Sequence, residues 1–177
     1  KGTSIIIARG MQADLIKSYT NIPVVEITLT AQEMGLLITE AKKRLNKKHP
    51  VIGVTGIRNM LCDMTYFDQI FDIELKTYIA NSQEELRDSV NKAILDKVDF
   101  IIGGNTAMAA AKQSNIPCLF LESTEDSIRE AFHMAKQLKY VSEIETKNAA
   151  QFETLMDYSF NGIIKINSDG KIIAVNH

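Results

Sequence analysis

This sequence has few cysteines, no excess of basic charge and no long apolar runs. Each of these features excludes a class of protein. The two cysteines, Cys62 and Cys118, are too few for a disulfide framework and lack metal-site spacing, so a reducing compartment is expected. The net charge of −2 gives no bulk attraction for nucleic acid, so any DNA-binding part must lie elsewhere. Apolar runs have the length of strands and no secretory signal is visible, which predicts a cytoplasmic protein without a membrane span.

Catalytic and cofactor motifs are also missing. The sequence contains neither the Walker phosphate loop nor the glycine fingerprint of dinucleotide-binding proteins. Its three histidines, His49, His133 and His177, have no metal-ligand spacing, and no Ser-His-Asp order or nucleophile elbow can be assembled. We therefore predict no catalytic residue, no metal and no cofactor.

The most informative feature that is present is a degenerate internal repeat. With a displacement of 94 residues and no gap, the segment from Ile7 to Lys42 matches the segment from residue 101 to residue 136. About two identities are expected by chance over such a length. The identical residues of the first copy are Ile7, Gly10, Ala13, Asn21, Ile22, Pro23, Thr30, Ala41 and Lys42. The repeat predicts two similar lobes and a ligand cleft between them.

Strand-like and helix-like segments alternate through most of the 177 residues. Strands are expected at 4–8, 22–29, 51–55, 73–79, 98–102 and 116–121, and helices at 11–19, 30–47, 59–70, 81–96, 105–113 and 124–139. Thr30 with Glu33 forms a capping-box pattern, and Ser82 is a second expected cap. Strict alternation predicts an α/β fold with parallel sheets, of the flavodoxin-like or periplasmic-binding-protein-like kind.

The expected domain organisation has four parts. Residues 1–49 form a first lobe, 50–123 a second lobe, 124–156 a long return and connector helix, and 157–177 the start of another domain. The first lobe has two expected strands and the second has four, so a strand–helix unit is expected to precede residue 1. Apolar residues spaced by three and four from Val141 to Leu155 are typical of helix pairing, and Asp169-Gly170 between two apolar runs predicts a hairpin.

Candidate binding residues follow the expected strands, because ligands of open parallel sheets bind beyond the carboxyl ends of the strands. Glycines there let backbone N–H groups approach a ligand, and helix N-termini favour anions. Arg9 is either a bidentate clamp for a carboxylate or a partner in a surface salt bridge. In the ungapped repeat it stands opposite Gly103. The candidate set is Arg9, Gly10, Thr55, Gly56, Arg58, Asn59, Gly104, Asn105, Thr106, Glu122 and Ser123.

Several runs resemble the N-terminal sensor domain of the propionate catabolism activator family. They are Ile5-Ile6-Ile7-Ala8-Arg9-Gly10, Ala13-Asp14-Leu15-Ile16, Ile22-Pro23-Val24-Val25-Glu26-Ile27, Ile52-Gly53-Val54, Val98-Asp99-Phe100-Ile101-Ile102-Gly103-Gly104, and Leu121-Glu122-Ser123 with Glu125-Asp126-Ser127-Ile128. Met11-Gln12 departs from the Gly-Thr that often follows Arg-Gly in the family. The stretch from Phe152 to Asn176 resembles the opening of a PAS domain.

The resemblance implies a bacterial enhancer-binding activator of the NtrC-like class. Such a protein joins its sensor to an AAA+ ATPase and a helix-turn-helix DNA-binding domain, acts with sigma-54 RNA polymerase, and forms a homodimer. The implied ligand is a small carboxylate similar to 2-methylcitrate. Outside this family the leading alternative is a small-molecule enzyme on a two-lobed scaffold, for which Glu122 and Glu26 are the available acid and base. A receiver-like module is disfavoured because the expected strand ends lack an acidic cluster, and a transport-type binding protein is disfavoured by the PAS-like tail.

Overall fold

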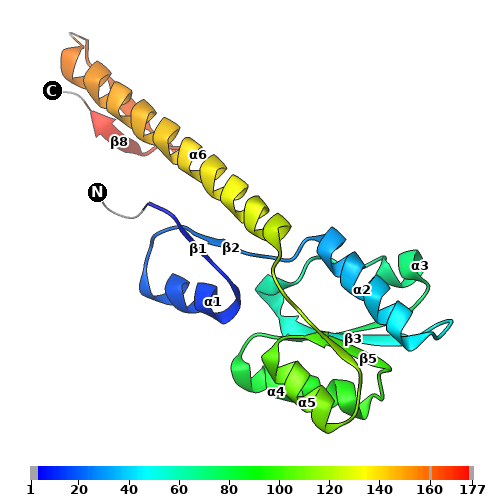
Figure 1. Cartoon of the computed structure of the whole chain (residues 1–177). Coiled ribbons are helices and arrows are strands. Elements are labelled where there is room, and N and C mark those ends of the chain that lie inside the picture. Colours follow the sequence, from blue (N-terminus) through cyan, green and yellow to red (C-terminus); the bar gives the residue numbers. More distant parts are fainter. Residues whose placement is uncertain (1–3, 160, 176–177) are drawn as a thin grey trace. The chain divides into compact units, whose positions relative to one another are not determined.

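The computed structural model describes residues 4–159 and 161–175. The chain divides into two compact units between Ala135 and Lys136. In the first unit the chain alternates between strands and helices along its length (Figure 1). Its elements are β1 (Ile6–Ala8), α1 (Gly10–Tyr19), β2 (Val24–Glu26), α2 (Ala31–Leu45), β3 (Val51–Ile57), the 3-10 turn η1 (Arg58–Met60), α3 (Phe67–Phe71), β4 (Glu74–Ala80), α4 (Gln83–Leu95), β5 (Phe100–Gly103), α5 (Asn105–Gln113), β6 (Cys118–Phe120) and the start of α6 (Glu125–Tyr158). Every strand pair in this unit is parallel, so the predicted α/β class is confirmed.

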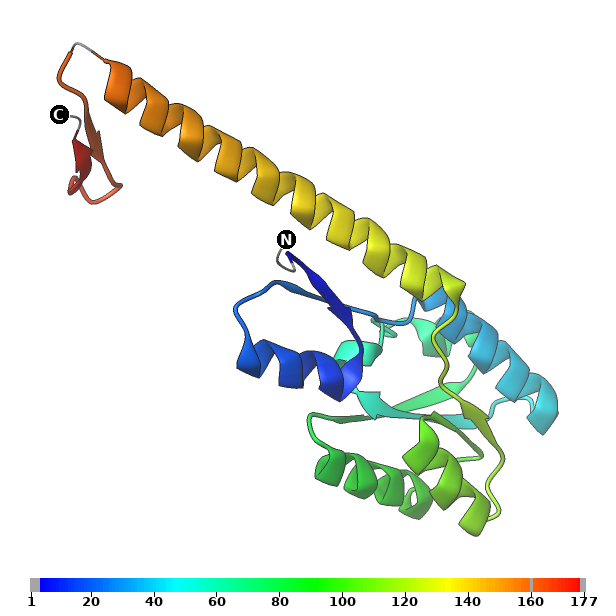
Figure 2. The same ribbon diagram turned by 60° about the vertical axis from the view of Figure 1, so that its left-hand side comes forward.

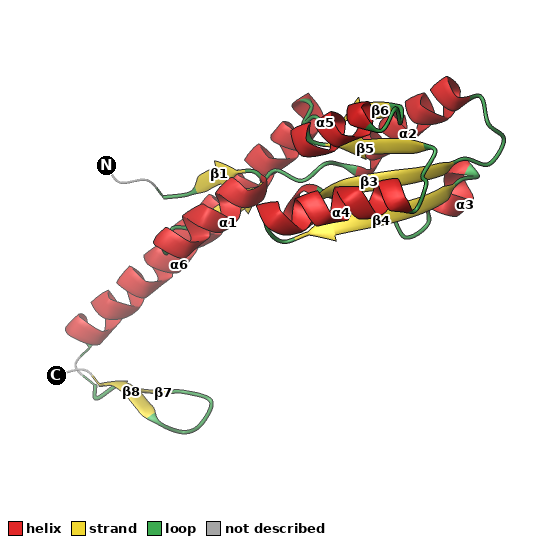
Figure 3. Cartoon of the chain, turned by 90° about the horizontal axis from the view of Figure 1, so that it is seen from below, coloured by secondary structure: helices red, strands yellow, loops and turns green. Residues whose placement is uncertain are grey.

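The larger sheet of the first unit has four strands in the order β4-β3-β5-β6. Helices α4 and α5 lie on one face of this sheet, and α2 lies on the other (Figures 1 and 3). The buried side chains alternate accordingly. Ile52, Val54, Phe100 and Ile102 join the core under α2, whereas Ile101 joins the core under α4 and α5. This alternation is the period-two pattern of a sheet that is covered on both faces.

The smaller sheet pairs β1 with β2 and carries α1 as its crossover helix (Figure 2). The predicted first lobe, residues 1–49, also includes α2. However, Met34, Ile38 and Ala41 of α2 are buried with the side chains of β3 and β5, so α2 packs with the four-stranded sheet. The predicted capping box at the start of α2 is confirmed, with Thr30 and Glu33 each accepting the other's backbone N–H. A strand–helix unit before residue 1 stays a prediction.

The two copies of the repeat fold into the same strand–helix–strand unit, but their first strands are offset by one residue. Ile6 donates its N–H to the carbonyl oxygen of Pro23 at 3.0 Å, and Ile101 donates to that of Pro117 at 3.0 Å. The two prolines are 94 positions apart, whereas the two isoleucines are 95 apart. The first copy therefore has one residue more between its strand and the end of its helix.

The extra residue lies within the first helix, since α1 has 10 residues and α5 has 9. Gly10, the first residue of α1, has a φ of +57°. This left-handed conformation is accessible to glycine without the steric cost that a Cβ brings. Arg9 and Gly104 are the N-cap residues of α1 and α5 respectively. By strand register and helix start, Arg9 therefore corresponds to Gly104, and the ungapped pairing of Arg9 with Gly103 is corrected by one residue.

The predicted helix at 59–70 is wrong. The chain instead forms η1, an extended loop and the short helix α3. Asp63 breaks the helical pattern, because its Oδ1 accepts hydrogen bonds from the backbone N–H and the hydroxyl of Thr65. A side chain that satisfies the backbone locally in this way competes with helix formation.

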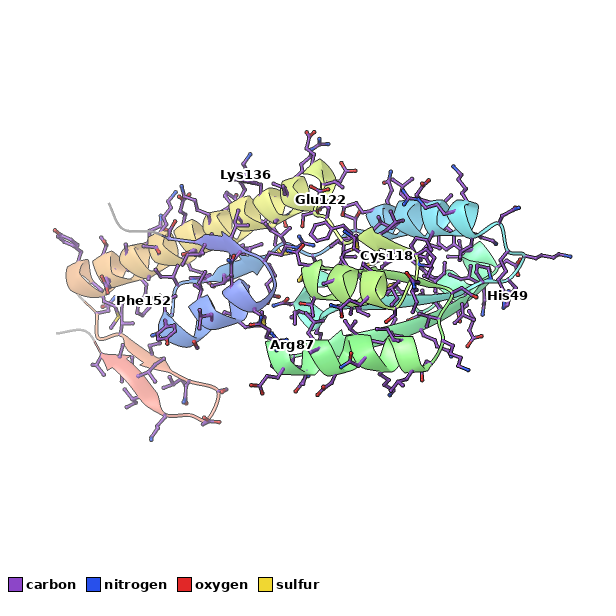
Figure 4. The ribbon with its side chains drawn as sticks, turned by 60° about the horizontal axis from the view of Figure 1, so that its bottom comes forward. His49, Arg87, Cys118, Glu122, Lys136 and Phe152 are labelled. Carbon is purple, nitrogen blue, oxygen red and sulfur yellow. The ribbon has the colours of Figure 1, made fainter. Side chains whose placement is uncertain are left out.

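The second unit contains the rest of α6 and the antiparallel hairpin of β7 (Ile164–Ile166) and β8 (Ile172–Val175). The hairpin predicted around Asp169-Gly170 is confirmed. Phe152, labelled on α6 in Figure 4, lies 4.6 Å from Lys165 Nζ, measured to the ring centre. A PAS domain at this end of the chain stays a prediction. In the described part of the chain, none of the helices combines the length and the apolar character that crossing a bilayer requires.

Candidate functional site

The carboxyl ends of β3, β5 and β6 meet at one edge of the four-stranded sheet, since parallel neighbours end on the same side. Thr55 lies near the end of β3, Gly103 ends β5, and Glu122 and Ser123 follow β6. Arg9 reaches this edge from the smaller sheet, because its Nη2 donates to the carbonyl oxygen of Leu121 at 3.0 Å. The fold therefore brings predicted residues from both repeat copies together.

Arg9 is a partly buried cation, and the part of the chain that the structure describes gives it no ion-pair partner. Burial lowers the pKa of its guanidinium, and the negative charges of Glu33 and Glu122 act in the opposite direction. Among the described residues no carboxylate lies within 4.0 Å of the Arg9 side-chain nitrogens, and its Nε is buried without a hydrogen-bond partner. The described residues therefore show no surface salt bridge at Arg9, and the role of a ligand clamp stays a prediction.

Four buried side-chain polar atoms in the described part of the chain have no hydrogen-bond partner, and all four belong to predicted site residues. They are Arg9 Nε, Thr55 Oγ1, Asn59 Oδ1 and Ser123 Oγ. Leaving a buried polar group unpaired costs about 1–3 kcal/mol, so native proteins rarely keep such groups without a ligand or water to bind them. The arrangement offers a cationic N–H donor, two hydroxyl groups and one amide acceptor.

Asn59 connects η1 to the smaller sheet. Its Nδ2 lies 3.1 Å from Gly10 O, from Asp14 Oδ1 and from Glu26 Oε1, which is one acceptor more than an amide nitrogen has hydrogens. This crowding orients the amide and leaves Oδ1 unpaired. Glu26 is also held by Lys17 Nζ at 2.5 Å, so the predicted acid or base of the alternative enzyme is engaged in structural contacts.

The two neighbouring glycines after β5 have different surroundings. A Cβ on Gly103 would lie 2.2 Å from Thr55 Oγ1 and 2.5 Å from the Cβ of Ala107, whereas a Cβ on Gly104 would meet nothing within 4 Å. Gly103 therefore provides close packing, and Gly104 leaves open space before α5. Asn105 and Thr106, in the first turn of α5, are exposed and half-buried respectively.

Three further predicted residues contribute none of these unpaired atoms. Gly56 is buried in β3, with Leu61 at ordinary contact distance from its Cβ position. Arg58 is exposed and lines a separate cavity of about 480 Å³ beside β4 and the 61–65 loop. Glu122 is exposed, in the segment that joins β6 to α6 (Figure 4). Among the described residues no group of His, Cys, Asp and Glu is large enough to hold a metal ion.

The sequence interpretation missed Glu33 as a residue of this region. Its side chain is 4% exposed and binds two helix N-termini. Oε2 accepts the backbone N–H of Thr30 at 2.7 Å, and Oε1 accepts the backbone N–H groups of Thr124 at 3.0 Å and Ser127 at 3.3 Å, as well as the Thr124 hydroxyl. Burial alone would raise the pKa of Glu33, but the hydrogen bonds from Thr124, Thr30 and Ser127 outweigh it and lower the pKa to about 2. The capping-box pattern was a signal for the contact with Thr30, but not for the contacts made 91 and 94 positions away.

The chain thus folds into an α/β domain with a parallel sheet, and polar side chains gather where the strands of this sheet end. The chain belongs to the propionate catabolism activator family, whose sequence profile matches residues 1–145. The crystal structure of an NtrC family transcriptional regulator from Clostridium acetobutylicum is similar in fold, with a TM-score of 0.61 and 21% identity. That match covers 79% of this chain and 73% of the other. No curated protein sequence matches this chain.

Proposed function

We propose that this domain senses a small carboxylate metabolite bound at the strand ends beside Arg9. The observation that carries the proposal is the set of buried, unpaired polar atoms on Arg9, Thr55, Asn59 and Ser123. A desolvated guanidinium with a free N–H gains most from an anion, because charge-assisted hydrogen bonds are about twice as strong as neutral ones. Membership of a family of activators makes a regulatory role the natural context for such a site.

The unpaired atoms also define the chemistry of the ligand. Arg9 Nε is a donor that suits a carboxylate oxygen, and the hydroxyl groups of Thr55 and Ser123 can donate to further oxygens. Asn59 Oδ1 can only accept, so it requires a donor such as a ligand hydroxyl. A hydroxy-carboxylate meets both needs, and 2-methylcitrate, the ligand that the family resemblance implied, is of this class.

In the full regulator, ligand binding would control an ATPase module and a DNA-binding module that act with sigma-54 RNA polymerase in the cytoplasm. A ligand shifts such an equilibrium only by its difference in affinity for the two states of the sensor. Helix α6 is a continuous 34-residue segment that begins directly after the site and leads away from it along the chain. It is therefore the natural route for the signal.

Calorimetric titration of the 177-residue chain with citrate, 2-methylcitrate and simple propionate-pathway acids tests the proposal. We expect saturable binding of at least one hydroxy-carboxylate and weaker binding of its analogue without the hydroxyl group, because Asn59 Oδ1 would then stay unpaired. Arg9→Ala is expected to weaken the binding of the carboxylate by about 1.5–3 kcal/mol, the usual value of a hydrogen bond to a charged group. Arg58→Ala is the matched control, since Arg58 lines a different cavity. Absence of binding to every acid at millimolar concentration would reject the proposal.

A homodimer formed through α6 is also part of the proposed regulator. Val141 and Leu155 are 51% and 66% exposed, and together with Ile144 they follow the three-and-four spacing of paired helices. Sedimentation velocity is expected to detect a dimer that Val141→Glu with Leu155→Glu converts to a monomer. Ala150→Glu, on the opposite side of the helix, is expected to leave the dimer intact. A monomeric parent chain would contradict this part of the proposal.

A further inference from the structure

Two helix N-termini share the carboxylate of Glu33. Glu33 caps its own helix α2 through Thr30 and caps α6 through Thr124 and Ser127. Each helix N-terminus carries a partial positive charge that favours an ionised carboxylate. The start of α6 is therefore held by a charged group that belongs to a different helix and comes from 91 positions earlier in the chain.

The same carboxylate acts on Arg9. The charges of Glu33 and of the guanidinium attract each other, although no ion pair within 4.0 Å joins them in the described residues. Arg9 Nη2 is bound to the carbonyl oxygen of Leu121, three residues before Thr124. The candidate anion site and the cap of α6 are thus neighbours in one cluster of charges.

We propose that Glu33 couples the occupancy of the Arg9 site to the first turn of α6, an inference that rests on the proposed function of that site. A ligand carboxylate on Arg9 would neutralise the cation that favours an ionised Glu33 and would add a second negative charge beside it. Both effects raise the energy of the negative charge on the Glu33 carboxylate, which caps α6. Ligand binding therefore loosens the contact of Glu33 with Thr124 and Ser127. Coupling between sites is reciprocal, so removing the charge of Glu33 tightens ligand binding.

Glu33→Gln tests this reciprocity, because glutamine keeps the shape of the side chain and loses its charge. Citrate, measured by calorimetry, is expected to bind the variant about fivefold more tightly than the parent, within the usual range of coupling between sites. Glu40→Gln is the matched control, since Glu40 is an exposed glutamate of the same helix that pairs with Arg44 at 2.9 Å. An affinity of Glu33→Gln for citrate equal to or weaker than that of the parent overturns the proposal.

Amide hydrogen exchange at residues 125–128 gives the second readout. Saturating citrate is expected to increase exchange there in the parent and to change it little in Glu33→Gln, in which the cap is already weakened. If Glu33→Gln fails to fold, Thr124→Val replaces it. This variant removes one hydrogen-bond donor to Glu33. It is expected to raise amide exchange at 125–128 and, like Glu33→Gln, to bind citrate more tightly than the parent. Unchanged exchange in the parent with citrate bound overturns the coupling.

A measurement without ligand separates this proposal from the proposed function. Arg9→Gln removes the cation that favours ionised Glu33, so exchange at 125–128 is expected to rise several-fold in the free protein, whereas Arg44→Gln leaves it unchanged. If no carboxylate binds the parent chain, the proposed function fails while this experiment still decides the coupling. If carboxylates bind but Arg9→Gln leaves exchange unchanged, the coupling alone fails.

Discussion

Gly103→Ala is expected to lower the free energy of unfolding by about 3 kcal/mol, at the upper end of the usual cost of overpacking a core. The new Cβ would lie 2.2 Å from Thr55 Oγ1, 2.5 Å from the Cβ of Ala107 and 3.2 Å from the backbone oxygen of Thr55. Two of these atoms are fixed to the backbones of β3 and α5, so the strain cannot be relieved by a side-chain rotation alone. Urea unfolding followed by circular dichroism measures the loss as a shift of the midpoint at constant slope.

Gly104→Ala is the control for this prediction. Gly104 has a φ of −78° and open space around its Cβ position, so alanine is expected to change stability by less than about 0.5 kcal/mol. Small losses for both variants would mean that Gly103 is not the point of close approach between β5, β3 and α5. A large loss at both positions would instead indicate that the whole turn is strained.

The contrast between these two glycines marks what the sequence could predict about the site. The Gly-Gly turn after a buried apolar run was correctly placed at the end of a strand, because strand length and the following helix pattern are local signals. Which glycine faces the core depends on Thr55 and Ala107. The first of these comes from a strand almost 50 positions earlier in the chain, and no local pattern contains that information.

Most helices and strands were predictable for the same reason, and the exceptions have physical causes. The helix expected at 59–70 fails because Asp63 satisfies the backbone of Thr65 within the loop. The assignment of α2 could not be read from order along the chain, since Met34 and Ile38 are buried by contacts with strands that come later. The repeat was real, but an ungapped alignment could not reveal that α1 is one residue longer than α5.

The candidate site shows more clearly that local sequence does not determine which side chains are buried together. Strand ends directed attention to Arg9, Thr55, Asn59 and Ser123, and the structure leaves one buried polar atom unpaired on each of them. Arg58 matched the same sequence criterion and lines a different cavity. Tertiary packing decides which polar side chains after a strand turn inward, and sequence position alone does not.

The stability of the domain is expected to fall steeply in acid because of Glu33. Its pKa in the folded chain is about 2, against an ordinary value of 4.5. A group whose folded pKa is depressed contributes stability that is fully present above its unfolded pKa and is lost as the pH falls through the folded pKa. The contribution of Glu33 is therefore complete above about pH 4.5, declines between pH 4.5 and 2, and is on the order of 3 kcal/mol.

Urea unfolding of the parent and of Glu33→Gln between pH 7 and pH 2.5 isolates this contribution from that of the other carboxylates. The stability difference between the two chains is expected to be large and constant from pH 7 to about pH 5 and to shrink steadily below that. Glu40→Gln provides the profile of an exposed glutamate on the same helix, and its difference from the parent is expected to stay below about 1 kcal/mol throughout. A Glu33→Gln difference that does not change with pH would mean that the ionised carboxylate does not hold α2 and α6 together. The coupling proposed for Arg9 would then lose its physical basis, because it depends on the charge of Glu33 and not on the shape of its side chain.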